Sequence, residues 1–300
     1  MNKTFLLSGG AGRIITAIPA LERYYHENGE TFNVVVYGWS NLYNCHPILH
    51  NRTYDINNRG IFELMIKGSE LICPEPYHVP DYYNQRINLI SAFDCCINGY
   101  YELNNKKVNL YLHSNEDFTA KKMIQDALKQ FKKEKFIVFQ PYGSGMQEVN
   151  GKYIDKSERS LYKEAAEYIA GTLSRDAVVL YFGDNKYAPN IPGVLNTKDI
   201  PGADLRFFMA MIANCDYFVG IDSVGQHMAA AFGKSGTIFM GSTFEENVTY
   251  PYWFKIIRKQ NMKPYYSPIR ISPVDVDYAE IGNDGIMNFT IDEINEALEK

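Results

Sequence analysis

The sequence predicts an α/β protein of two compact domains that share a cleft, and three observations support this. First, 300 residues exceed one typical domain, and a hydrophobic fraction of 46% supplies apolar side chains for two cores. Second, short apolar runs alternate with helical periodicity from about residue 134 onward, which predicts a parallel sheet covered on both faces. Third, each half opens with an apolar run that leads into a glycine turn.

The first forty residues have the pattern of one βαβ unit. An apolar run at 4–7 predicts a strand, the glycines of 9–12 predict a turn, apolar residues at helical spacing follow over 14–25, and the β-branched run 32–37 predicts the next strand. The stretch 39–105 is rich in Tyr, Asn, Cys, His and Pro and has weak periodicity. Such a stretch is typical of loops and short elements around a site, and we predict no individual element in it.

A charged amphipathic helix is predicted over 119–133, and the boundary between the domains is placed at its end, giving domains 1–133 and 134–300. The strands predicted after it are 136–140, 177–182, 217–220 and 237–240. The helices predicted after it are 157–173, 204–214, 223–232 and 291–299. The last helix is left free to pack back on the first domain.

Charge and cysteine content exclude several classes of protein. Thirty basic and thirty-five acidic residues give a net charge of −5, so the chain lacks the overall positive charge that is typical of nucleic-acid-binding proteins. Five cysteines without a C-x-x-C pair indicate reduced thiols in a cytoplasm. No secretion signal and no apolar run long enough for a membrane span is present. We expect a cytoplasmic protein, with a peripheral contact at the inner face of a membrane left open.

The strongest local signal lies in residues 215–233. A buried strand is predicted to end at Asp222, Ser223 is a good helix N-cap, and the run of alanines 229–231 allows close packing on a sheet. The N–H groups and dipole of that helix start favour an anion at the carboxyl edge of the sheet, where His227 would lie in the first turn. A capped helix with a partly buried histidine explains the isolated pattern equally well.

This block resembles the D-[ST]-G-x-x-H-x-A-A-A signature of glycosyltransferase family 9, the ADP-heptose:lipopolysaccharide heptosyltransferases. That family has the GT-B fold, in which two Rossmann-like domains with parallel sheets face each other across a cleft. Residues 8–21 resemble the family's opening glycine motif, and 139–144 with Lys152 and Tyr153 resemble its P-G-A-S and K-[RH]-W segment. Residues 178–184 resemble its next strand and turn, so the similarity follows the chain in order.

The resemblance implies a set of donor-binding residues. The donor pyrophosphate would be held by Asp222, Ser223, Val224, Gly225 and His227. The same phosphates would be approached by Gly143, Ser144 and Lys152, and the donor nucleoside by Gly183 and Asp184. The glycine loop of the first domain would consist of Gly9, Gly10 and Gly12. A helix N-terminus with Lys and His can stabilise a departing diphosphate, so a nucleotide sugar is the expected co-substrate, with no cofactor and no metal.

Two positions depart from the family pattern. Val224 stands where the signature has glycine, which would loosen the backbone approach to phosphate or reshape the sugar pocket. Arg13 stands where the family has an acidic residue that resembles a general base, and an arginine cannot accept the proton. Three alternatives remain open: another carboxylate acts instead, inverting chemistry is lost, or Arg13 binds an acidic acceptor or the donor phosphate. The candidate carboxylates are Asp55, Asp81 and Asp94.

The expected function is a glycosyltransferase that moves a sugar from a nucleotide-sugar donor to an acceptor hydroxyl, with inversion, on a glycan of lipopolysaccharide type. An alternative acceptor is a hydroxymethylated DNA base, as in bacteriophage transferases of this fold class, which would need a basic groove formed by residues 129–135 or 258–263. An alternative of another class is a non-catalytic nucleotide-sugar-binding protein that lacks the family base. The oligomeric state is left open.

Overall fold

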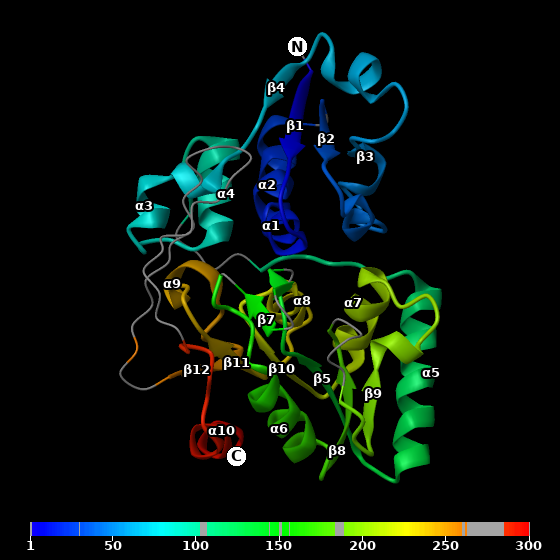
Figure 1. The fold of residues 1–300 in the computed structure, drawn as a ribbon. Helices are drawn as coiled ribbons and strands as arrows, with labels where there is room; N and C mark the ends of the chain where they lie inside the picture. The colour runs from blue at the N-terminus through cyan, green and yellow to red at the C-terminus, as the bar shows by residue number, and fades with distance from the viewer. Residues whose placement is uncertain are drawn as a thin grey trace. The chain divides into compact units, whose positions relative to one another are not determined.

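The computed structural model describes residues 2–29, 31–102, 107–143, 145–149, 152–155, 157–183, 189–259, 262 and 285–299 (Figure 1). The chain divides into two compact units, the first of which contains residues 1–113, and the second begins at Ser114. Among the described residues, no helix combines the length and the apolar character that a membrane crossing requires.

The first unit contains a four-stranded sheet in the order β3-β2-β1-β4, in which every pair of neighbours is parallel. Its strands are β1 (Lys3–Leu7), β2 (Phe32–Val36), β3 (Thr53–Asp55) and β4 (Glu70–Ile72). Its α-helices are α1 (Ala11–Thr16), α2 (Ile18–Asn28), α3 (Pro80–Tyr83) and α4 (Leu89–Asn98). Shorter turns of helix span Ser40–Tyr43, His50–Arg52, Phe62–Ile66 and Pro76–His78.

The βαβ unit predicted for the first forty residues is present, but its helix is divided in two. Pro19 lies in the first turn of α2 and has no N–H to donate, and its ring would collide with the carbonyl of Ile15 in a continuous helix. The chain therefore breaks at Ala17 and starts a new helix. Strands β1, β2 and β3 follow one another in one direction, and β4 then joins on the other side of β1, so the strand order reverses between β1 and β4.

The second unit contains a six-stranded, fully parallel sheet in the order β12-β11-β10-β5-β8-β9. These strands are β5 (Lys135–Gln140), β8 (Ala177–Tyr181), β9 (Val194–Asn196), β10 (Tyr217–Ile221), β11 (Gly236–Met240) and β12 (Phe254–Arg258). The helices are α5 (Ser114–Phe131), α6 (Lys163–Leu173), α7 (Leu205–Asn214), α8 (Val224–Ala231), α9 (Glu245–Val248) and α10 (Ile291–Leu298), with a short turn at Thr197–Asp199. A separate antiparallel hairpin pairs β6 (Met146–Val149) with β7 (Lys152–Asp155).

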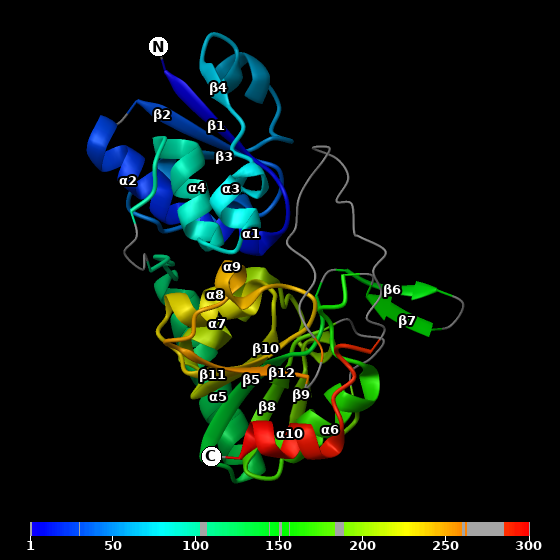
Figure 2. The ribbon, with the colours of Figure 1, turned by 90° about the vertical axis from the view of Figure 1, so that its left-hand side faces the viewer.

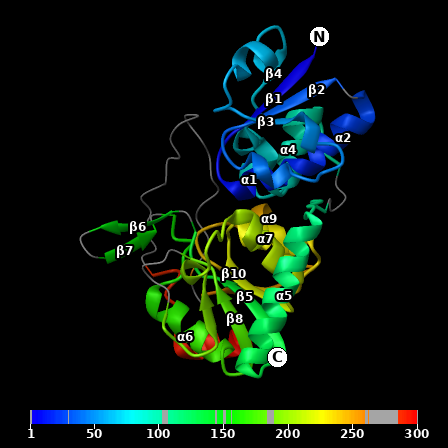
Figure 3. The ribbon, with the colours of Figure 1, turned by 90° about the vertical axis from the view of Figure 1, so that its right-hand side faces the viewer.

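Helices cover both faces of the second sheet, as the sequence predicts for a parallel sheet (Figures 2 and 3). On one face, Ile169 of α6 and Ile294 of α10 pack into a core with Phe139 and Tyr181 of the strands. On the other face, α5 packs against α7, and Arg206 Nε of α7 donates to Glu116 Oε1 of α5 at 2.8 Å. The order of strands reverses between β5 and β10, because β8 and β9 follow on one side of β5 and β10 to β12 on the other.

Two predictions of element position differ from the structure, and a third position that was left open is now defined. The units separate at 113/114 and not at 133/134, because α5 packs on α7 and so belongs to the second unit. The helix predicted over 157–173 begins only at Lys163, because residues 157–162 form a loop held by side-chain hydrogen bonds to Asp155. For the last helix, whose packing the sequence left open, the structure shows contacts with α6 of the second unit.

Candidate functional site

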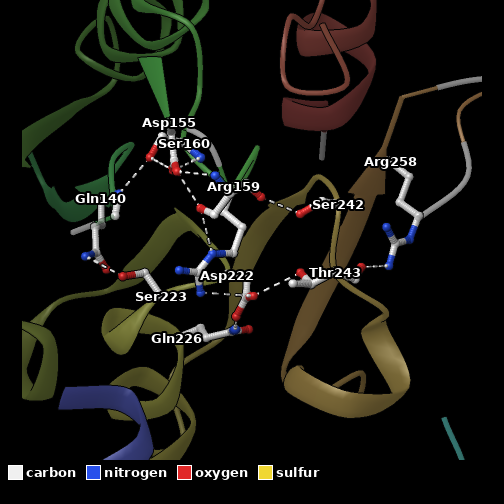
Figure 4. A network of polar contacts seen from close by, with 12 residues as sticks. Gln140, Asp155, Arg159, Ser160, Asp222, Ser223, Gln226, Ser242, Thr243 and Arg258 are labelled. Atoms are coloured by element: carbon white, nitrogen blue, oxygen red, sulfur yellow. Dashed lines mark hydrogen bonds and ion pairs between the residues drawn. The ribbon is translucent and has the colours of Figure 1, made fainter. Parts of the chain in front are cut away.

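The candidate site lies at the carboxyl edge of the second sheet, where the strand order reverses. Gln140 is the last residue of β5, and Asp222 follows β10, the strand beside it. Open α/β sheets bind ligands at such a reversal, because the connections leave in opposite directions and expose the strand ends. A network of polar side chains gathers at this edge (Figure 4).

Asp222 organises the centre of this network. Its buried carboxylate accepts a hydrogen bond from Gln226 Nε2 at 2.8 Å on one oxygen and from Thr243 Oγ1 at 2.9 Å on the other. Arg159 Nη1 lies 3.7 Å from the same carboxylate. The side chain therefore connects the end of β10, the start of α8 and the loop after β11, and it acts as an anchor of the site.

The first turn of α8 is held by Gln140. Ser223 occupies the N-cap position in an extended conformation, but its side chain makes no capping hydrogen bond among the described residues. Ser223 Oγ accepts instead from Gln140 Nε2 at 3.1 Å, while Gln140 Oε1 accepts from the N–H of Gly225 at 3.0 Å. The prediction that Ser223 is the N-cap residue of this helix is confirmed, while the side-chain hydrogen bond to the first turn comes from Gln140 of the neighbouring strand.

Gly225 is required by packing. A Cβ atom at this position would lie 2.3 Å from Gln140 Oε1 and 2.6 Å from the ring of Phe218. The family signature has its glycine at the position of Val224. In this chain the position that must be small is Gly225. The substitution at Val224 therefore leaves the close approach between α8 and β5 intact.

A loop next to this helix is fixed by Asp155 at the end of β7. Its carboxylate accepts from the backbone N of Ser157 at 2.9 Å, from the backbone N of Ser160 at 3.0 Å, and from the hydroxyls of both serines. Ser160 Oγ in turn accepts from the N–H of Gly143 at 3.0 Å. The predicted phosphate neighbour Gly143 is thus joined by a hydrogen bond to a loop that the sequence did not reveal.

This loop carries Arg159, a cation that the sequence analysis did not single out. Arg159 Nε donates to Ser157 Oγ at 3.1 Å, and its side chain remains 31% exposed. A second arginine, Arg258 at the end of β12, donates to the carbonyls of Gly241 and Thr243 at 3.1 and 2.9 Å and so holds the loop after β11. No sequence motif identifies Arg159. Its position is set by the hydrogen bonds of the loop after β7, which no helix or strand periodicity reveals.

His227 is buried in α8 and has a neutral ring at pH 7. Burial lowers its pKa to about 4, with Asp222 acting in the opposite direction and Arg159 adding to the decrease. The Nδ1 atom lies 2.7 Å from the hydroxyl of Tyr250, whose pKa is raised by burial. His227 therefore brings no positive charge to the site.

The remaining predicted residues divide into three groups. Ser144 and Asp184 lie outside the described residues, and Lys152 begins β7 with a side chain that is not among those described. Gly183 follows β8, where a Cβ would lie 3.1 Å from the ring of Tyr142. The glycine loop and Arg13 belong to the first unit: Gly9 has φ +108, Gly10 precedes α1, and Gly12 lies within it.

Arg13 is buried in the first unit. Its Nη2 atom donates to the carbonyl of Pro74 and to Glu75 Oε2, both at 3.0 Å. The rings of Tyr77 and Phe93 lie 4.9 and 5.7 Å from its guanidinium carbon. Across the described part of the chain, no cluster of three or more His, Cys, Asp or Glu side chains is arranged to hold a metal ion.

No family model matches the sequence. No curated protein matches it either. Solved structures do resemble the chain. A structure described as a family 9 glycosyltransferase from Veillonella parvula is 12% identical, covers 99% of this chain and 96% of its own, and has a TM-score of 0.66. The Escherichia coli glycosyltransferase TibC, described as iron-containing and dodecameric, is 11% identical and covers 99% and 77%, with a TM-score of 0.63.

The Escherichia coli heptosyltransferase WaaC, solved with ADP, is 12% identical and covers 85% of this chain and 92% of its own, with a TM-score of 0.55. These similarities extend over both units of the chain. They confirm the predicted fold: two parallel sheets with helices, as in the GT-B glycosyltransferases of family 9.

Proposed function

We propose that this chain is an inverting, metal-independent glycosyltransferase whose second unit binds a nucleoside-diphosphate sugar. The observation that carries the proposal is the start of α8, held by Gln140 at the strand reversal between β5 and β10 with Arg159 beside it. The first unit would bind the acceptor, a glycan hydroxyl in the reading that follows from the family resemblance.

The chemistry requires a site that stabilises negative charge. As the bond between the anomeric carbon and the diphosphate breaks, its electron pair remains on the departing phosphate oxygen. The positive end of a helix dipole favours that charge, and so does a guanidinium, which can donate two parallel hydrogen bonds to a phosphate. Because His227 is neutral, we assign the cationic contribution to Arg159, and Lys152 stays a prediction.

The similar structures supply a first donor to test. WaaC was solved with ADP and with ADP-2-deoxy-2-fluoro heptose, and TibC with ADP-D-beta-D-heptose. These are properties of those proteins, and they make ADP-heptose the first donor to test here. A non-catalytic binding protein would have the same donor-binding residues as an enzyme and would differ from it only in lacking turnover.

The test measures binding and turnover separately. Calorimetry with ADP-, UDP- and GDP-sugars, ADP-heptose included, should give one donor that binds, and release of its nucleoside diphosphate should be detectable. Arg159→Gln should weaken that binding about 10- to 100-fold, the loss of one charged phosphate contact. Arg175→Gln, at an exposed arginine before β8 at the opposite edge of the sheet, is the matched control and should bind as the parent does.

Absence of binding by all these donors would refute the proposed function. Equal binding by Arg159→Gln and Arg175→Gln would refute the assigned phosphate contact. Tight binding without nucleoside diphosphate release under any condition would favour the non-catalytic protein.

A further inference from the structure

We infer that Glu75 is the proton acceptor of the transfer reaction, in place of the residue at position 13; the inference rests on the proposed function. It starts from the topology of the first sheet. The order of strands reverses between β1 and β4, which are neighbours. Arg13 follows β1 through the glycine turn, and Glu75 follows β4, so both flank the reversal at the carboxyl edge.

Arg13 is fixed and cannot take part in proton transfer. Its buried guanidinium lies near the rings of Tyr77 and Phe93, whose faces attract a cation. Arginine remains protonated in proteins and has no acceptor atom. What the side chain can do is hold a partner, and its Nη2 lies 3.0 Å from Glu75 Oε2.

Glu75 combines a fixed orientation with access to solvent. Besides the contact with Arg13, its Oε1 accepts a hydrogen bond from the backbone N of Tyr77 at 3.4 Å. The side chain nevertheless remains 22% exposed. A carboxylate that is oriented by an arginine and exposed to solvent is a candidate general base; the reaction further requires the acceptor hydroxyl to bind within hydrogen-bond reach of it.

The other candidate carboxylates of the first unit fit less well. Asp94 is 1% exposed, and it accepts from Arg23, from Asn98 and from the backbone N of Glu102, so no acceptor molecule can reach it. Asp55 ends β3, the strand farthest from the reversal on its side. Its Oδ1 accepts hydrogen bonds from the backbone N and from the side-chain Nδ2 of Asn57 in a local turn.

Asp81 completes the set of candidates. It lies in α3, which does not follow a strand of the sheet directly, and it is engaged by Arg86 Nη1 at 3.1 Å and by the hydroxyl of Tyr101 at 3.0 Å. Glu75 is therefore the carboxylate that combines the strand reversal, the contact with Arg13 and exposure.

The edge also offers a surface that suits a sugar ring. Tyr37 and Trp39 follow β2 and are 61% and 45% exposed. Trp39 adopts φ +63, a conformation that is rare for a residue other than glycine. Aromatic faces with polar edges suit the apolar face of a sugar, which agrees with an acceptor held near this end of the sheet.

The step balances as a single displacement. The oxygen of the acceptor hydroxyl forms a bond to the anomeric carbon of the donor, and its proton passes to the carboxylate of Glu75. The bond from the anomeric carbon to the diphosphate oxygen breaks, and its electron pair leaves with the nucleoside diphosphate. The proton on Glu75 then returns to solvent.

The experiment uses the full chain, the sugar nucleotide that binds in the donor panel, and water as the acceptor. Glu75→Gln should leave donor affinity within about twofold of the parent and reduce nucleoside diphosphate release about 100-fold or more. Glu75→Asp, which keeps the carboxylate, should retain part of the rate. In Glu75→Ala, added sodium formate should restore release, because a small carboxylate can occupy the space and accept the proton.

Glu27→Gln is the matched control, because Glu27 also pairs with a buried arginine, Arg23, at 2.7 Å. It should release nucleoside diphosphate as the parent does. Release by Glu75→Gln within threefold of this control would overturn the inference while donor binding still supports the proposed function. The inference would also be overturned if Glu75→Ala lost nucleoside diphosphate release that formate did not restore and Glu75→Asp were equally inactive. A residue that only stabilises the structure through Arg13 predicts that result. Failure of the parent to bind any donor would remove the proposed function itself.

Discussion

The side-chain amide of Gln140 makes two hydrogen bonds to the start of α8: it accepts from the N–H of Gly225 at 3.0 Å and donates to Ser223 Oγ at 3.1 Å. One residue at the end of β5 thereby fixes the helix that follows β10. The contact satisfies one of the N–H groups that a first turn leaves without an intrahelical partner. It also sets how closely the two elements approach, and the first prediction concerns that distance.

Gly225→Ala should lower the free energy of unfolding by about 1–3 kcal/mol, the usual cost of overpacking. The added methyl would lie 2.3 Å from Gln140 Oε1 and 2.6 Å from the ring of Phe218. The hydrogen bond between Gln140 and residue 225 must therefore lengthen or break. Gly171→Ala, within α6, is the control, because among the described residues the added methyl would meet Ile191 alone, at an ordinary contact distance of 3.8 Å. Alanine favours the helix there, and urea denaturation should show Gly171→Ala unchanged or up to about 1 kcal/mol more stable. Equal losses in the two variants would contradict the packing argument.

His227 should make the stability of the fold depend on pH. Its pKa is lowered to about 4 by burial, whereas the unfolded chain has the ordinary value near 6.5. Below the ordinary value the unfolded chain binds the proton and the folded chain does not, so stability is complete above about pH 6.5 and falls toward about pH 4. The loss attributable to this residue should be roughly 2–3 kcal/mol.

The measurement compares the parent with His227→Gln by chemical denaturation across that pH range. Other groups titrate in both proteins, so the difference between the two curves isolates the histidine. The parent should lose more stability on acidification than the variant. Parallel curves would show that the ring gains a proton in the fold as easily as in the unfolded chain.

Much of the fold follows from local patterns in the sequence. The strands 136–140, 177–182, 217–220 and 237–240 match β5, β8, β10 and β11 closely, because each is a short apolar run between turn signals. Short strands with mixed composition, such as β3, β4 and β9, lack that contrast. The prediction of a helix from residue 157 was wrong because local spacing does not reveal that Asp155 holds Ser157 and Ser160 in a loop.

The candidate site was predictable only in part. The start of α8 could be located because Asp222 and Ser223 lie at a strand-to-helix junction that is visible in the sequence. The sequence could not predict that Gln140, Arg159 and Thr243 belong to the site, because they contact Asp222 or Ser223 from distant parts of the chain. The same holds for Glu75, whose partner Arg13 lies on another element.

Asp94 should act as a structural residue. Its carboxylate forms a buried ion pair with Arg23 at 2.9 Å, and Asp94→Asn would leave that arginine's charge without this partner in the interior. We expect unfolding free energy to fall by about 3–5 kcal/mol, the range for a buried pair broken on one side. Glu27→Gln removes a carboxylate from the same arginine at a position that is 41% exposed, and should cost about 1 kcal/mol or less. Donor turnover per folded molecule should stay near the parent value for Asp94→Asn at low temperature. A large loss of turnover in fully folded Asp94→Asn, with Glu75→Gln unaffected, would move the proton acceptor to Asp94.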